Sequence, residues 1–134
     1  MKIRIAKPED VSVLSKHDHH IEKGELCLLI KLGRVLVAEK DNDFIGWLRW
    51  NLFWDNTPFM NMLYLLDGYR NKGYGKEMVA HWENLMKDKG YPLVMTSTLS
   101  SEAAQHFYRK LNYIDSGSLL LKNEPLEIIL TKEI

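Results

Sequence analysis

One stretch decides the fold: Leu63-Tyr64-Leu65-Leu66-Asp67-Gly68-Tyr69-Arg70-Asn71-Lys72-Gly73-Tyr74-Gly75-Lys76-Glu77-Met78-Val79. Nearly every position from Met60 to Leu66 is apolar, which is typical of a strand covered on both faces. After the glycine-bearing turn, apolar residues recur with the 3.6-residue period of a helix, at Met78, Val79, Trp82, Leu85 and Met86. The stretch therefore predicts a buried strand, a tight turn and a long helix.

The turn has the features of a phosphate cradle. Gly73 and Gly75 allow backbone angles and a close ligand approach that side chains would prevent. The first amides of a helix have no partner inside it, and the helix dipole places partial positive charge there. Arg70, Lys72 and Lys76 add basic charge. We therefore predict that residues 70–76 bind a phosphate or a diphosphate.

Two common nucleotide motifs do not fit this turn. A Walker loop needs Gly-Lys-Ser/Thr at its end, but Gly73 is followed by Tyr74, and Lys76 by Glu77. A dinucleotide fingerprint would need a glycine where Met78 stands. The pattern that fits is Arg/Gln-x-x-Gly-x-Gly/Ala. With this segment the chain resembles the GNAT superfamily of N-acetyltransferases, whose members hold the diphosphate of acetyl-coenzyme A with this loop.

A second segment supports the resemblance: Ala104-Gln105-His106-Phe107-Tyr108-Arg109-Lys110-Leu111-Asn112-Tyr113. It resembles the family's Ala-x-x-Phe-Tyr-x-Lys-x-Gly-Phe helix ending, with Asn112 in place of the glycine. Asparagine also tolerates the left-handed conformation that a helix end requires. Two motifs in the right order are more specific than either alone, and the resemblance covers nearly the whole chain.

The remaining segments complete a mixed fold. Strands are expected near residues 2–6, 35–40, 44–50, 60–66, 93–96, 113–121 and 126–131, and helices after Pro8, near 21–32, after the glycine turn and from Ser100. The order is strand, two helices, three strands, helix, strand, helix, two strands. We expect an α/β (α+β) fold of GNAT type, with a mostly antiparallel central sheet flanked by helices, in one domain over residues 1–134.

Composition limits the partners. Eighteen basic and eighteen acidic residues cancel, which argues against nucleic acid or an anionic membrane as a partner. The single Cys27 excludes an internal disulfide and is expected to be buried in a helix. The alternating N-terminus lacks the apolar run of a signal peptide, and no apolar segment approaches ~20 residues. We expect a cytoplasmic protein, either a monomer or a homodimer.

The family resemblance assigns roles around the coenzyme. It implies that Tyr108 contacts the coenzyme and protonates or hydrogen-bonds the leaving thiolate, and that Leu65 and Leu66 offer backbone groups. Tyr108 alternatively completes an apolar stripe on its helix. Ser101 stands where the family often has an asparagine that contacts the pantetheine arm. Helix capping by Ser100 or Ser101 is the other reading.

The general base and the acceptor site stay open. Many relatives place a glutamate on the central strand, but residues 59–66 contain no carboxylate. The candidate bases are Asp67, Asp55, Glu22 and Glu25, with water chains as an alternative, and a solvated surface group is the favoured reading of each acid taken singly.

The acceptor side is equally open. Trp50 or Trp54 could line an acceptor pocket, where an aromatic face also holds a cationic amine; core packing is the alternative. Glu25 is a further candidate for the acceptor site. His17, His19 and His20 lack the spacing of a metal site, so we expect a solvated loop and no metal.

We therefore expect a transferase that moves an acetyl group from acetyl-coenzyme A to an amine of a small molecule or a peptide by direct attack. The first alternative is a non-catalytic coenzyme A-binding regulatory or interaction module. The second is an unrelated phosphate-binding α/β domain.

Overall fold

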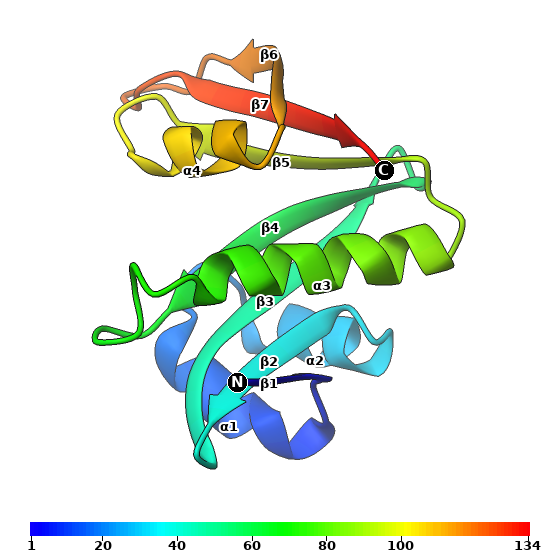
Figure 1. Cartoon of the computed structure of the whole chain (residues 1–134), viewed down its shortest axis with the longest axis vertical. Coiled ribbons are helices and arrows are strands. Elements are labelled where there is room, and N and C mark those ends of the chain that lie inside the picture. The colour runs from blue at the N-terminus through cyan, green and yellow to red at the C-terminus, as the bar shows by residue number, and fades with distance from the viewer. The chain divides into compact units, whose positions relative to one another are not determined.

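The structure, a computed structural model, describes residues 1–134. Its strands are β1 (Lys2–Ile5), β2 (Val35–Lys40), β3 (Asp43–Phe53), β4 (Thr57–Leu65), β5 (Leu93–Leu99), β6 (Ile114–Leu119) and β7 (Glu127–Glu133). Its helices are the 3₁₀ turn η1 (Pro8–Asp10), α1 (Val11–His17), α2 (Lys23–Lys31), α3 (Tyr74–Asp88) and α4 (Ala104–Lys110) (Figure 1). This is the predicted order of elements.

The seven strands follow the order β1-β2-β3-β4-β5-β7-β6 in a mixed sheet. β4 and β5 run parallel, because α3 crosses between them, whereas the pairs β1–β2, β2–β3, β5–β7 and β6–β7 are antiparallel. The predicted α+β fold with a mostly antiparallel sheet is confirmed. None of the helices is both long enough and apolar enough to cross a membrane.

The chain forms two compact units, each built from two separate stretches. The first contains Met1–Asn51 and Met62–His81, and the second contains Leu52–Asn61 and Trp82–Ile134. β3, β4 and α3 therefore contribute residues to both units. A single domain over residues 1–134 stays a prediction.

The core of the first unit lies where α1 and α2 pack on β2 and β3 (Figure 1). Leu26, Leu29 and Ile30 of α2 are buried there, as their spacing predicted. The β2–β3 turn places Asp41 and Asn42 at φ 52° and 67°. Two left-handed residues make the tight hairpin turn that the sequence predicted.

A buried ion pair connects the end of α1 to β3. The carboxylate of Asp18 is 3% exposed. It accepts hydrogen bonds from Arg49 Nε at 2.7 Å and from Trp47 Nε1 at 2.9 Å. The predicted solvated loop at residues 17–20 is therefore wrong at Asp18, because its partners lie on a strand 29 and 31 residues further along the chain.

Burial and the neighbouring Arg49 have opposite effects on the pKa of Asp18. Burial by itself would raise the pKa of Asp18, but the hydrogen bond and the charge of Arg49 lower it, and the net pKa lies below the usual value. A carboxyl group whose pKa is lower in the folded than in the unfolded protein stabilises the fold at pH values above its unfolded-state pKa. That stabilisation is lost as the pH falls through the folded pKa.

Polar contacts connect several elements of the second unit. Thr96 Oγ1 donates to the carbonyl of Met60 at 2.9 Å, beside the parallel β4–β5 pairing. Glu83 on α3 accepts from the Tyr113 hydroxyl and from Lys132 Nζ, both at 2.8 Å. One carboxylate thus links α3, the chain after α4, and β7.

Three local predictions are wrong. β4 is not covered on both faces, because its burial alternates and Tyr64 is 41% exposed. Cys27 is exposed rather than buried. Neither Ser100 nor Ser101 caps α4: the helix begins at Ala104, and no side chain caps it.

We predict that Asp18→Asn lowers the free energy of unfolding by about 3–5 kcal/mol, because it leaves the Arg49 guanidinium buried without its counter-charge. The measurement is urea denaturation at neutral pH. Asp115→Asn is the matched control, because Asp115 forms a similar pair with Arg109 but its side chain is 50% exposed. The control should change stability little. Equal losses in both variants would contradict a special role for the buried pair.

Candidate functional site

The predicted phosphate-binding turn lies between β4 and α3. Left-handed conformations at Gly68, Asn71 and Gly73, with φ of 90°, 60° and 88°, turn the chain from the strand into the helix. The carbonyl of Leu66 accepts from the amide of Tyr69 at 3.1 Å and closes the first part of the loop. The loop residues 70–73 are exposed.

The first turn of α3 presents free donors. Its helical bonding begins where the amide of Glu77 donates to the carbonyl of Gly73 at 3.1 Å. The amides of Tyr74, Gly75 and Lys76 therefore have no carbonyl partner within the helix. Together with the dipole of a 15-residue helix, they form the kind of site that binds anions.

The two glycines of the motif are needed for different reasons. At Gly73 the φ is 88°, and a Cβ would meet no atom within 4 Å, so the demand for glycine is conformational. Gly75 lies within the first turn of α3, where any residue can adopt the backbone angles. A side chain at that position would instead take up space beside the free amides.

Arg70 fastens the loop to β4. Its Nε donates to the carbonyl of Leu65 at 2.9 Å, and its guanidinium lies 4.7 Å from the centroid of the Tyr64 ring. Its Nη1 is 3.5 Å from Asp67 Oδ1. These contacts orient the side chain of Arg70, which is 48% exposed and keeps guanidinium N–H donors for an anion, so its role as a phosphate ligand stays a prediction.

Some backbone groups at the end of β4 already form hydrogen bonds within the protein. The amide of Leu66 donates to the carbonyl of Ile45 on β3 at 2.8 Å. The carbonyl of Leu65 accepts from Arg70. A carbonyl has a second lone pair and can accept from a ligand too, but the Leu66 amide cannot donate elsewhere without breaking its bond to β3.

Tyr108 lies on α4 and is 7% exposed. Burial raises the pKa of Tyr108 to about 12, although a hydrogen bond with the hydroxyl of Thr96 partly lowers it. Its ring makes edge contacts with Phe107 and Tyr113, at centroid distances of 5.1 and 5.5 Å. A thiol has a pKa of about 8.5, so full proton transfer from this phenol to a thiolate would be uphill by ~5 kcal/mol. The phenol is suited to donate a hydrogen bond.

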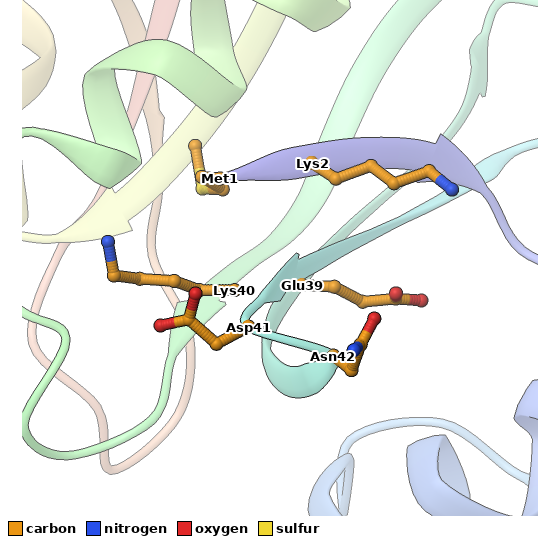
Figure 2. A pocket seen from close by; sticks show the side chains of 6 residues that line it. All are labelled: Met1, Lys2, Glu39, Lys40, Asp41 and Asn42. Carbon is orange, nitrogen blue, oxygen red and sulfur yellow. The ribbon is translucent and has the colours of Figure 1, made fainter.

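A basic residue that no sequence motif marks lies beside the side chain of Tyr74, the first residue of α3. Lys40 Nζ lies 5.5 Å from the centroid of the Tyr74 ring. Lys40 also lines an open hollow of about 300 Å³ at the β2–β3 turn (Figure 2). Nothing in the local sequence marks Lys40, because its position depends on how β2 and β3 pair.

With this geometry in place, comparison with known proteins decides the family. A model of the acetyltransferase (GNAT) family matches residues 5–113. The chain belongs to the GNAT family of acetyltransferases. No curated protein sequence matches the chain significantly.

Solved structures share this GNAT fold. Ard1 from Thermoplasma volcanium is 12% identical, with a TM-score of 0.85 over 99% of this chain and 97% of Ard1. A GNAT acetyltransferase from Bacillus cereus is 20% identical, with a TM-score of 0.80 over 98% and 96% of the two chains. YncA from Salmonella typhimurium, solved with acetyl-CoA, is 15% identical, with a TM-score of 0.80 over 99% and 93%.

The GNAT chain shows no sheltered carboxylate among the candidate bases. The side chain of Asp67 is 95% exposed and is paired with Arg70. Asp55, Glu22 and Glu25 are also exposed. No group of three or more His, Cys, Asp or Glu side chains is placed to hold a metal ion. The acids have the surroundings of surface groups.

The proposed acceptor residues differ in exposure. Trp54 is 79% exposed, and its ring lies tilted against Phe53 at a centroid distance of 4.7 Å, so it has surface to offer a substrate. Trp50 is 2% exposed, which favours the alternative of core packing. Ser101 is exposed in the turn before α4, where Gln105 Nε2 donates to the carbonyls of Ser100 and Glu102 at 2.8 and 2.9 Å.

Proposed function

We propose that this GNAT protein is an acetyl-CoA-dependent N-acetyltransferase that acts on an amine of a small molecule or a peptide. The observation that carries the proposal is the first turn of α3, with free amides at Tyr74, Gly75 and Lys76 after a left-handed Gly73. An array of donors at a helix start binds a diphosphate through both hydrogen bonds and the dipole. Binding of acetyl-CoA by YncA is consistent with this use of the fold.

The coenzyme contacts come from the loop and from two further positions. The α3 amides, Arg70, Asn71, Lys72 and Lys76 bind the diphosphate, and Arg70 also holds the loop in the shape that presents them. Leu65 and Leu66 contribute carbonyl groups to the pantetheine arm, and the hydroxyl of Ser101 contributes a polar contact. Acetyl-CoA supplies a thioester that is already activated towards an amine.

The reaction is a direct attack. A neutral amine adds to the thioester carbon, the carbon–sulfur bond breaks, and the coenzyme leaves as a thiolate. Tyr108 stabilises the thiolate by donating a hydrogen bond, since its raised pKa opposes complete proton transfer. The proton released by the amine goes to Asp67 or to water.

A second candidate function is a non-catalytic coenzyme A-binding module. The observation that favours it is the exposure of every candidate base, Asp67, Asp55, Glu22 and Glu25. Such a module would bind the coenzyme through the same loop. It would release no thiol in the presence of any amine.

The test is an acetyl-transfer screen over amines, amino acids, aminoglycosides and peptides, read by release of coenzyme thiol. Turnover with an amine supports the acetyltransferase. Coenzyme binding without turnover across the panel supports the binding module. Thermal stabilisation by nucleotides but not by acetyl-CoA would contradict both and indicate an unrelated phosphate-binding role.

We predict that Tyr108→Phe lowers kcat by roughly 10- to 100-fold, because the thiolate loses its hydrogen-bond donor. The Kd for acetyl-CoA should stay nearly unchanged. Steady-state kinetics and calorimetry measure the two quantities. Tyr113→Phe is the control, since it removes a neighbouring hydroxyl that bonds Glu83 instead. Unchanged turnover in Tyr108→Phe would remove Tyr108 from the mechanism.

We predict that Gly75→Leu weakens acetyl-CoA binding by at least about tenfold, because the side chain covers the free amides. The folded state should tolerate it, since leucine is a better helix former than glycine. Gly24→Leu is the matched control: Gly24 lies in α2, and a Cβ there meets nothing within 4 Å. Calorimetric titration measures the affinity, and equal affinities for the two folded variants would contradict the placement of the diphosphate.

A further inference from the structure

A cation from the β2–β3 hairpin lies at the start of α3. Lys40 is the last residue of β2, and Tyr74 is the first residue of α3. The distance of 5.5 Å between Lys40 Nζ and the Tyr74 ring centroid is within the range of a cation–π contact. A lysine amine is charged at neutral pH, and a hydrogen bond to the Tyr74 side chain raises the pKa of Lys40 further.

Backbone pairing fixes the position of Lys40. It lies opposite Asp43 in the β2–β3 register, directly before the tight turn of Asp41 and Asn42. Further along β3, the carbonyl of Ile45 accepts from the amide of Leu66 at 2.8 Å. This hydrogen bond joins β3 to the residue after β4, and Lys40 is positioned near the loop by its pairing with β3.

No carboxylate lies within ion-pair distance of Lys40, although the charge of the adjacent Asp41 acts on it. The ion pairs of the structure do not include it, and the carboxylate of the adjacent Glu39 is bound by Arg4 at 2.6 Å. Arg70 donates to the carbonyl of Leu65, lies near Asp67 and covers the Tyr64 ring. Lys40 therefore adds a cation that the sequence motif does not name.

We propose that Lys40 is a further coenzyme-binding residue, which binds the coenzyme diphosphate together with the first amides of α3. The Tyr74 ring holds the ammonium group at the helix end. An ammonium acts as a point charge on phosphate oxygens, and it adds to the partial positive charge of the helix start. This inference rests on the proposed function, because it needs the coenzyme at this loop.

The test is calorimetric titration of Lys40→Met with coenzyme A at low ionic strength. The Kd should rise roughly tenfold, because one charge is removed from the diphosphate site. Lys2→Met is the matched control: it lines the same hollow and removes the same net charge, but the Lys2 and Lys40 side chains extend in opposite directions (Figure 2). The control should bind coenzyme A as the wild type does.

Three further measurements sharpen the test. Lys40→Arg keeps the charge and should bind within about threefold of the wild type. The difference between wild type and Lys40→Met should shrink as salt is added, because salt screens exposed charges. With 3′-dephospho-coenzyme A, which keeps the diphosphate, the loss of affinity in Lys40→Met should be the same. Lys40→Gln repeats the comparison if the methionine variant does not fold.

Unchanged affinity in Lys40→Met would overturn the assignment, and so would an equal loss in Lys2→Met. A loss that disappears with 3′-dephospho-coenzyme A would place Lys40 on the 3′-phosphate and overturn the diphosphate contact. Failure of the wild type to bind coenzyme A at all is a different result. It would overturn the proposed function itself.

Discussion

The free amides in the first turn of α3 are the constraint around which the candidate site is built. Backbone N–H groups without a partner must meet solvent or an anion, so this helix start has to remain accessible. The left-handed residues before it turn the chain sharply out of β4. Gly73 meets that need at no steric cost, whereas Asn71 shows that asparagine also tolerates the conformation.

The loop keeps its shape through contacts of Arg70 and Leu66 that cannot be read from the sequence motif. Arg70 reaches back to the carbonyl of Leu65 and covers the Tyr64 ring, and Leu66 is bonded to β3. These contacts fix the turn from which the first amides of α3 begin. Under the proposed function, Arg70, the loop lysines and Lys40 of the neighbouring hairpin supply positive charge for the coenzyme.

The environment of two buried polar groups determines their chemistry. Asp18 stays ionised because Arg49 outweighs the effect of burial, so its carboxylate serves as a structural anchor between α1 and β3. Tyr108 has no such counter-charge, and burial raises its pKa to about 12. A phenol in that state keeps its proton and is best used as a hydrogen-bond donor.

The sequence by itself determined the features that depend on neighbouring residues. These are the order of elements, the apolar stripe of α3, the Asp41–Asn42 turn, the left-handed Asn112 and Gly73, and the two motifs that resemble the GNAT family. Only the tertiary structure decided the burial of Asp18, the exposure of Cys27, the contacts of Arg70 and the placement of Lys40 beside Tyr74. The reason is physical: turns and helix periods are set within a few residues. The partner of a charge or the cover of a side chain depends instead on strand pairing and on packing between segments far apart in the chain.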